Sequence, residues 1–391
     1  MEARSARSKK TESEIREWNA NVNENVKKIV PRTGGKIDFW LLAAVLVLVA
    51  IGLYMSLTTS YYNNLLDGAA SPMKTFYKQV IFTVAGLVVM FAMCFRWDYA
   101  VLVKNRLVYK LLWGACVLVL AAVLFLGSEA NGAGRWINLG FISIQPSEFV
   151  KFAIAVCLAA YLQKHYRPSR KNFWIMLILI AGIPAGLIFL QKAMSMTMIV
   201  LLMTFTVLLV SGASWGRLSL IALMGAAAVV VGICFEPFRL ERILDYLHGN
   251  LEYQALQSVY GFANGGLFGV GMNGSMQKYG FLPEAENDCV FSIFAEEWGF
   301  VGVVLLIALY VFVIWRGLRI AQNARCRFGA YTAFGIIIMI AMQTVINMAV
   351  ACALFPVTGQ TLPMISVGGS ALLANFMAFG LLLNISKDVY C

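Results

Sequence analysis

The chain has 391 residues, of which 60% are hydrophobic and only 13% are charged, and its mean hydropathy is +0.75. A water-soluble domain carries about a quarter charged residues, so this composition indicates an integral membrane protein. The formal net charge of +11 does not indicate a nucleic-acid-binding protein, because most of the 31 Lys and Arg residues lie in short segments between apolar stretches. Two histidines, and eight cysteines without paired spacing, predict neither a His-rich metal centre nor a disulfide framework.

The N-terminal segment is polar and precedes a long series of apolar stretches. Residues 1–36 carry charges of both signs and lack the apolar core of a signal peptide, which predicts a cytoplasmic tail. The stretches that follow are each long enough to cross about 30 Å of hydrocarbon. They predict an all-α polytopic membrane protein, with ten transmembrane helices in one domain, residues 37–386. The stretches lie at 38–57, 77–95, 109–127, 147–163, 173–190, 194–212, 217–235, 290–315, 331–352 and 368–385.

The distribution of positive charge predicts the orientation of these helices. Most Lys and Arg residues fall in the segments on the same side as the N-terminus. By the positive-inside rule that side is the cytoplasm, so both termini of this multi-pass protein should be cytoplasmic. A large extracytoplasmic loop, residues 236–289, then connects helices 7 and 8, and a second outer loop spans 128–146. We expect the chemistry of the protein at this outer face.

The second outer loop leads into the fourth helix through a group of polar residues. Pro146 and Ser147 predict a helix start, with Ser147 as the N-cap. Glu148 falls in the first turn, and Lys151 follows three residues later on the same face, where the two side chains can form an ion pair. Such pairs usually line a cavity in a membrane protein, so a structural pair and a pair that contacts substrate both agree with the pattern.

The large outer loop begins with two arginines and continues into a glycine-dense stretch. Arg239 and Arg242 share a helix face and could donate to a phosphate or pyrophosphate, or could be solvated arginines at the membrane interface. The glycines between 261 and 274 match no nucleotide-binding motif. They would permit the close backbone approach that a lipid-pyrophosphate groove needs, and a re-entrant loop would need them equally.

Asp288 lies where this loop enters the eighth helix. Partial desolvation at such a boundary raises the pKa of a carboxylate and makes it a better proton acceptor. The alternative role is a helix N-cap, for which Asp is a favoured residue. Glu296 and Glu297 lie about 12–13 Å further along the helix. They are functional candidates, although a structural hydrogen bond at the Gly299 break would also explain them.

The last outer segment, between the ninth and tenth helices, contains no Lys, Arg, Asp or Glu and concentrates Pro, Gly, Ser and Thr. Non-helical backbone at membrane depth must line a cavity or pack on protein, because lipid cannot satisfy its amides. We therefore expect this segment to form one wall of a site.

Four separated motifs resemble those of one known family. They read GAGRWINLGFISIQPSEFVK (132–151), YQALQS with GGLFGVG (253–271), SMQKYGFLPEAENDCVFSIFAEEWGFVG (275–302) and PVTGQTLPMISVGGSALLAN (356–375). On these motifs the chain from about 38 to 386 resembles the SEDS family of bacterial membrane proteins, the shape, elongation, division and sporulation group that includes FtsW and RodA.

The resemblance implies a fold of ten membrane helices and a location in the bacterial cytoplasmic (inner) membrane, with an extracytoplasmic active site. It implies a peptidoglycan glycosyltransferase, which polymerises lipid II into undecaprenyl-linked glycan and releases undecaprenyl pyrophosphate. The implied partners are a class B penicillin-binding protein transpeptidase and other divisome membrane proteins, and no nucleic acid. The aspartate that the family requires falls on Asp288, and its conserved Glu and Lys fall on Glu148 and Lys151. The LPEA sequence before Asp288 is closer to the division type than to the elongation type.

The expected mechanism is inverting, with Asp288 as the general base that takes a proton from the acceptor hydroxyl. The departing pyrophosphate would need positive charge, either from a basic side chain or from a divalent cation, Mg²⁺ or Mn²⁺. The residues expected to bind substrate or support the site are Glu148, Lys151, Arg135, Arg239, Arg242, Lys278, Gln277, Ser275, Glu284, Glu296, Ser366, Gly368, Gly369 and Ser370.

Rival interpretations are a lipid II flippase or transporter, a scaffold for a transpeptidase, and an elongation-type polymerase similar to RodA. The chain also departs from the family pattern in three places. Residues 191–197 read QKAMSMT where relatives commonly have QPDLGTA, so no role of that aspartate is carried over. Gln360 and Val367 replace an apolar residue and a Tyr, and the family's HTDF is ENDC at 286–289.

Overall fold

The computed structural model describes residues 35–66, 71–96, 99, 101, 106–126, 128–130, 133–138, 143–164, 170–234 and 237–387. The predicted cytoplasmic tail, apart from its last two residues, lies outside this described part.

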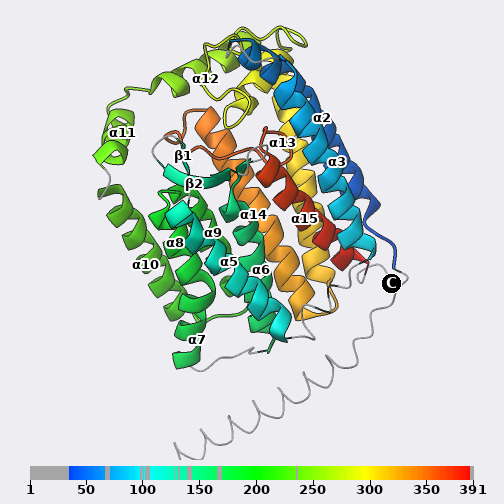
Figure 1. Ribbon diagram of the computed structural model, residues 1–391, viewed down its shortest axis with the longest axis vertical. Helices are drawn as coiled ribbons and strands as arrows, with labels where there is room; N and C mark the ends of the chain where they lie inside the picture. The colour runs from blue at the N-terminus through cyan, green and yellow to red at the C-terminus, as the bar shows by residue number, and fades with distance from the viewer. Residues whose placement is uncertain are drawn as a thin grey trace, which may run out of the picture.

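The described chain is mostly helical, and its long helices run side by side as a bundle (Figure 1). The apolar stretches form helices because a helix satisfies its own backbone amides and carbonyls without water. The bundle consists of α2 (Phe39–Leu66), α3 (Lys74–Phe95), α5 (Arg106–Leu126), α6 (Pro146–Lys164), a continuous run of α7 (Arg170–Leu177), η1 (Ile178–Gly182) and α8 (Ile183–Leu190), α9 (Met194–Val210), α10 (Trp215–Cys234), α13 (Val290–Asn323), α14 (Arg327–Ala351) and α15 (Gly369–Ser386).

Eight helical segments in the described part of the chain are long and apolar enough to cross a membrane. The protein is therefore a mostly helical, polytopic membrane protein. The two remaining predicted spans coincide with α6, which carries Glu148 and Lys151, and with α9, which has only 17 residues. Ten crossings stay a prediction.

The centre of the bundle is built on α14 and α15. Of the most apolar 18 residues of each helix, 78% are buried inside the protein in α15 and 61% in α14, but only 17% in α10. Helices α14 and α15 therefore form the core, and α10 lies at the periphery. Small residues allow the central helices to approach closely. A Cβ on Gly380 of α15 would stand 2.8 Å from the Met90 carbonyl oxygen of α3, and one on Gly335 of α14 would stand 3.2 Å from the Cβ of Ala155 on α6.

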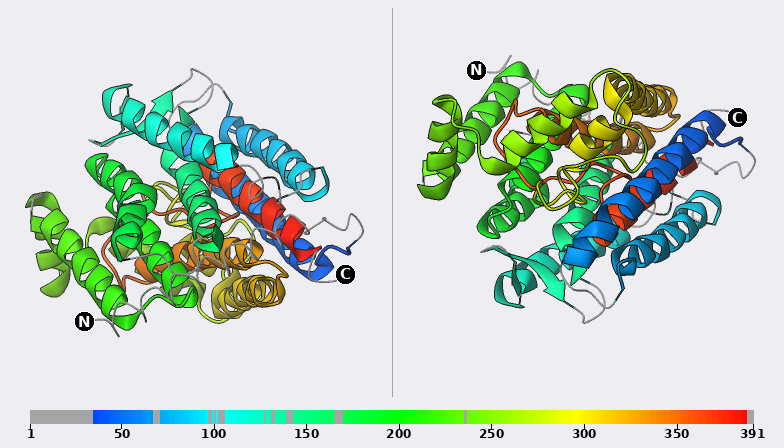
Figure 2. Two further views of the ribbon diagram at one scale, coloured as in Figure 1. Left: turned by 90° about the horizontal axis from the view of Figure 1, so that it is seen from below. Right: turned by 90° about the horizontal axis from the view of Figure 1, so that it is seen from above.

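The segment predicted as a large outer loop is partly helical. It contains α11 (Pro237–Leu247) and α12 (Tyr253–Gly265), and residues 266–289 follow without a regular helix. Figure 1 shows α11 and α12 across one end of the bundle, and Figure 2 shows α12 lying over this end when the bundle is viewed from above. The helices and irregular backbone of this segment thus cover the end that holds Asp288.

The other predicted outer loop contains three short strands. β1 (Ser128–Ala130) and β2 (Ala133–Asn138) pair antiparallel, and β2 pairs antiparallel with β3 (Ser143–Ile144). β3 leads directly into α6, which places the small sheet beside the start of that helix.

The glycine-dense stretch packs on α13 where that helix is interrupted. Gly299 has φ 65° and ψ −169°, outside helical values, a conformation that glycine adopts without strain. The amides of Phe300 and Val301 donate to the carbonyls of Gly266 (2.9 Å) and Leu267 (3.1 Å). A side chain on Gly269 would overlap the Glu297 carbonyl oxygen. The glycines of this stretch therefore allow its backbone to pack closely on α13.

Candidate functional site

Asp288 lies in a tight turn directly before α13. The amides of Asn287 and Cys289 both donate to the Glu284 carbonyl, at 3.0 and 3.3 Å, and so close this turn. The helix begins at Val290, with Cys289 in the N-cap position, so the alternative role of Asp288 as the N-cap is wrong. The carboxylate of Asp288 therefore does not cap α13.

The segment between α14 and α15 forms the wall opposite this turn. The amide of Val367 donates to the Glu286 carbonyl at 2.9 Å, and the Ser366 hydroxyl donates to the Asn287 carbonyl. A Cβ on Gly359 would stand 3.7 Å from Oδ2 of Asp288. Backbone from two loops, far apart in the sequence, therefore meets at the Asp288 side chain.

The surroundings of Asp288 favour its protonated form. The residue is half-buried, and burial raises the pKa of its carboxyl from the ordinary value of 3.8 to about 7, with a further contribution from the negative charge of Glu284. Burial likewise raises the pKa of the neighbouring Cys289 thiol to about 12, so this thiol is not a nucleophile at neutral pH. A carboxylate that titrates near pH 7 is suited to general base catalysis.

Glu148 and Lys151 form the ion pair that their spacing predicts. The Lys151 Nζ lies 2.7 Å from Oε2 of Glu148, and each side chain is only 1% exposed. Within the described residues neither charged group makes a hydrogen bond to any other side chain or backbone group. The prediction that Ser147 caps this helix is wrong, because α6 begins at Pro146 and the Ser147 hydroxyl, inside the first turn, has no hydrogen-bond partner among described residues.

Lys278 is buried in a charged network on the side of α13 that faces α2. Its Nζ lies 3.0 Å from Oε1 of Glu297 and donates to Oδ1 of Asn273 at 2.6 Å. The Tyr54 hydroxyl of α2 donates to the other Glu297 oxygen at 2.8 Å. Neither Lys278 nor Glu297 has exposed side-chain surface. Their ion pair holds the 266–289 segment on α13, and Glu297 neutralises the positive charge of Lys278.

Glu296 binds the start of the predicted motif at 275–302. Its carboxylate accepts hydrogen bonds from the amides of Met276 and Gln277, both at 3.2 Å, from the Ser275 hydroxyl, and from Nδ2 of Asn264 at 3.1 Å. Ser275, Gln277 and Glu296 are therefore brought together, slightly more than two helical turns beyond Asp288 along the chain. Their contacts are those of a structural hydrogen-bond cluster at the Gly299 break.

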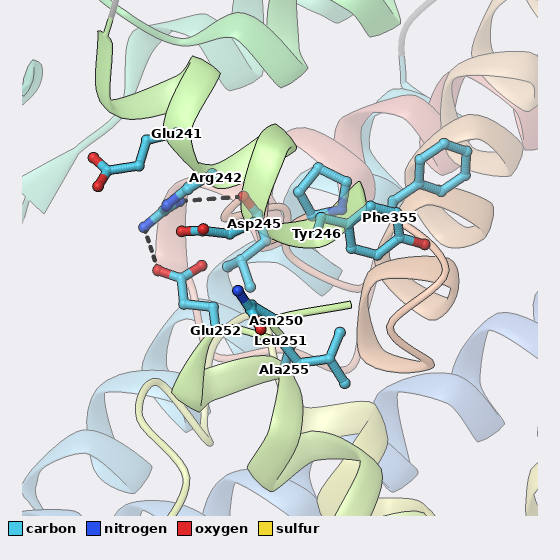
Figure 3. A pocket seen from close by; sticks show the side chains of 11 residues that line it. Glu241, Arg242, Asp245, Tyr246, Asn250, Leu251, Glu252, Ala255 and Phe355 are labelled. Carbon is cyan, nitrogen blue, oxygen red and sulfur yellow. Dashed lines mark hydrogen bonds and ion pairs between the residues drawn. The ribbon is translucent and has the colours of Figure 1, made fainter. Parts of the chain in front are cut away.

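Arg242 lines a pocket of about 390 Å³ between α11, the start of α12 and the segment that follows α14 (Figure 3). Its guanidinium lies 2.8 Å from Oε1 of Glu252 and donates to the Val357 carbonyl at 3.4 Å. Glu241 and Asp245 add two more carboxylates to the lining, so the pocket has more acidic than basic groups. The same α11 carries Arg239, whose side chain lies outside the described part of the structure.

The remaining predicted residues join the sheet and the last loop to the bundle. Arg135, on β2, donates through Nε to the Gln191 carbonyl at 3.2 Å. The Ser370 hydroxyl accepts from the amide of Gln145 at 3.0 Å and so connects the starts of α15 and α6. The amide of Gly368 donates to Oε1 of Gln79 at 3.4 Å. Gly369 packs against the ring of Phe82.

One buried amide that the sequence analysis did not single out also reaches this site. Asn347, on α14, donates through Nδ2 to the Asp288 carbonyl at 2.8 Å and to the Gln360 carbonyl at 2.6 Å. Its signal in the sequence is a polar residue inside an apolar span. No group of three or more His, Cys, Asp or Glu side chains that could hold a metal ion occurs among the residues whose placement is described.

The chain is similar in sequence to known bacterial proteins. The Bacillus subtilis stage V sporulation protein E is 37% identical over 363 residues, which cover 90% of this chain and 97% of that protein. A Coxiella burnetii protein named "Probable peptidoglycan glycosyltransferase FtsW" is 34% identical over 363 residues, which cover 90% of this chain and 96% of that protein.

Solved structures show the same fold. A chain from a structure described as "Structural coordination of polymerization and crosslinking by a peptidoglycan synthase complex" has a TM-score of 0.74 and 30% identity, with 90% of this chain and 98% of that chain covered. The rod shape determining protein RodA of Thermus thermophilus has a TM-score of 0.67 and 29% identity, with 91% of this chain and 98% of that chain covered. A family model described as "Cell cycle protein" and named for FtsW, RodA and SpoVE matches residues 39–390. The chain therefore belongs to the FtsW, RodA and SpoVE family of membrane proteins.

Proposed function

We propose that this protein is a peptidoglycan glycosyltransferase that polymerises lipid II at the outer face of the cytoplasmic membrane, with Asp288 as its general base. The observation that carries the proposal is the half-buried Asp288 carboxyl, whose pKa of about 7 lies near physiological pH. Relatives that share about a third of its sequence are named as glycosyltransferases of this kind.

In the proposed reaction, the acceptor lipid II presents the 4-hydroxyl of its N-acetylglucosamine to Asp288. The carboxylate takes the hydroxyl proton while the oxygen forms a bond to the anomeric carbon of the growing chain. The bond from that carbon to undecaprenyl pyrophosphate breaks, and its electron pair leaves with the pyrophosphate. Attack opposite the leaving group inverts the anomeric carbon.

The charge that develops on the pyrophosphate needs a partner. Lys278 and Arg242 are two of the four basic side chains that could supply it, with Arg135 and Arg239, but each of these two lies within 3.0 Å of a carboxylate, which reduces its net attraction for an anion. The described residues include no group of three or more His, Cys, Asp or Glu side chains that could hold a metal ion, so their donor set does not fit a resident metal site. In this proposal Mg²⁺ or Mn²⁺ enters only as a counter-ion of the substrate pyrophosphate.

The polymerisation proposal is tested with purified protein and lipid II in detergent. Asp288→Asn removes the base with little change in size, and glycan formation should fall by about a hundredfold or more. The matched control is Asp245→Asn, an acid-to-amide change on exposed α11, which should stay within about twofold of wild type. Near-normal turnover by folded, lipid-binding Asp288→Asn protein would remove Asp288 from the role of base.

The same assay separates the enzyme from the flippase or transporter. In detergent no membrane has to be crossed, so product strands are evidence of polymerisation rather than of transport. Adding a class B penicillin-binding protein then tests the scaffold alternative, in which turnover depends on that partner. We also propose the division role, and depletion of the protein should then produce filaments, whereas loss of an elongation-type polymerase should produce round cells.

The proposed topology has ten crossings, cytoplasmic termini and an extracytoplasmic site. Single cysteines in a cysteine-free variant, placed at Asn250 and at Arg325, test it with a membrane-impermeant thiol reagent. In intact cells the reagent should label the cysteine at position 250 only. Labelling at position 325 in intact cells would show that the orientation is the opposite of the proposed one.

A further inference from the structure

We propose that Asn347 is a positioning residue for Asp288. Its side chain joins the turn at Asp288 and the segment between α14 and α15 to one rigid point on α14. This inference rests on the proposed function, because it assigns to Asn347 the task of holding the proposed base. It concerns a residue of the ninth apolar stretch that contributes no charge of its own.

The geometry of the Asn347 side chain supports this role. The side chain is 1% exposed, and its two amide hydrogens are directed to two main-chain carbonyls, those of Asp288 (2.8 Å) and Gln360 (2.6 Å). These acceptors lie 59 residues before Asn347 and 13 residues after it, so they belong to different loops. One amide therefore bridges the turn before α13 and the segment between α14 and α15.

The orientation of the amide is fixed by the chemistry of its neighbours. If the group were rotated by 180°, Oδ1 would face the two carbonyl oxygens, and acceptor would oppose acceptor. The neutral amide donates to both carbonyls without placing a charge in this buried position. An aspartate of the same shape would place negative charge against both carbonyls, and a leucine would leave both of these acceptors without a donor.

Asn347 is anchored near the end of a buried helix, and this makes it an effective fixed point. α14 ends at Ala351, one turn later, and the Asn347 backbone belongs to the regular helix. By contrast, the Asp288 turn and the Gly359–Gln360 segment have no helical hydrogen bonds of their own. Loss of the bridge should therefore allow the Asp288 backbone to move, and a displacement of about 1 Å costs up to a hundredfold in rate.

The charged groups around Asp288 determine how this movement affects titration. Glu284 and Glu286 are the ionisable neighbours on its own turn, together with the Cys289 thiol. Among described residues, α14 contributes the neutral Asn347, and the 353–368 segment contributes no ionisable side chain. Burial is the main cause of the raised pKa of Asp288, so greater access of water should lower that pKa toward its ordinary value.

The experiment compares purified Asn347→Leu and Asn347→Ser with wild type in the lipid II assay from pH 5 to 9. Leucine keeps the branched shape of the side chain and removes both donors, while serine can donate to only one carbonyl. We expect kcat per folded molecule to fall by about 10- to 100-fold for leucine and by less for serine, with KM little changed. The acid limb of the pH profile should move down by about half a pH unit or more.

The matched control is Gln343→Leu, one turn earlier on α14. Gln343 is 0% exposed and its amide makes no hydrogen bond to the described residues, so its replacement should leave both kcat and the acid limb as in wild type. Asn347→Gln, which keeps the amide, should restore part of the activity lost in Asn347→Leu.

A purely structural role for Asn347 would lower the yield of folded protein without moving the acid limb. If the leucine or the serine variant, whichever is recovered folded, has wild-type kcat and an unmoved limb, the positioning role is wrong. That result leaves Asp288 as the base, whereas an active Asp288→Asn variant overturns the proposed function itself. The two failures are thus distinguishable.

Discussion

Removal of the Asp288 charge should stabilise the folded protein, and more so at high pH than at low pH. The folded state holds the Asp288 proton more tightly than the unfolded chain does, because burial raises the pKa of this carboxyl from 3.8 to about 7. The destabilisation from the ionised carboxylate is therefore absent at pH well below 3.8, grows between 3.8 and about 7, and is complete above that range. Asp288→Asn, which cannot ionise, removes it.

The magnitude follows from the difference between the two pKa values. A tenfold change in proton affinity corresponds to about 1.4 kcal/mol, so the ionised group destabilises the folded state by about 4 kcal/mol at pH 8 and about 2 kcal/mol at pH 5. Because Asp288 is only half-buried, solvent screens part of this effect. We therefore expect the stabilisation by Asp288→Asn to differ between pH 8 and pH 5 by about half of the difference between these two values. For a chain of this length that is a difference of about 2 °C in the gain of Tm.

The assay is thermal unfolding of wild type and Asp288→Asn in one detergent at pH 5 and pH 8. The variant should unfold at higher temperature than wild type, with the larger gain at pH 8. Asp245→Asn, on the exposed surface of α11, serves as the control and should show no such dependence on pH. An equal gain at both pH values, or a loss at pH 8, would refute the reasoning that burial raises the pKa of Asp288.

Three further changes test neighbouring parts of the structure. Glu284→Gln removes the negative charge that adds to the raised pKa of Asp288, so the acid limb of kcat/KM against pH should move to lower pH, and an unmoved limb would contradict this. Lys278→Met leaves Glu297 buried without its cation and should reduce the free energy of unfolding by about 3–5 kcal/mol, measured by denaturation. The double variant Lys278→Met with Glu297→Gln should recover most of that loss, and a single variant as stable as wild type would show that the pair does not hold the loop. Lys151→Ala leaves Glu148 unpaired inside α6, so activity or Tm should fall, and no change in either, in detergent and in membranes, would rule out the ion pair as a required element.

The sequence predicted the helices well because their cause is local. Long apolar stretches satisfy their backbone groups within a helix, whatever surrounds them, and each predicted stretch coincides with a helical run. The Gly299 break and the Glu148–Lys151 pair were also predicted, since both depend on residues close together in the chain. The Ser147 cap failed because Pro146 is itself accommodated in the first turn of α6.

The roles of the polar side chains at the Asp288 end of the bundle needed the tertiary structure. Lys278 and Glu296 are candidates for substrate binding when only the sequence is known, yet their partners are Glu297 and the backbone at 276–277. Which group neutralises a charge depends on distance in space, and residues that are distant in the chain supply that group.

The amino-acid sequence by itself determined that this is a helical membrane protein of a recognisable family and that Asp288 stands directly before a long apolar helix. These properties follow from composition, periodicity and motifs along one chain. Only the tertiary structure decided that Gly359 lies beside the Asp288 carboxylate and that Asn347 binds the Asp288 backbone. The physical reason is that the site is assembled from the end of α14, the turn before α13 and the loop between α14 and α15, and their meeting depends on how the whole bundle packs.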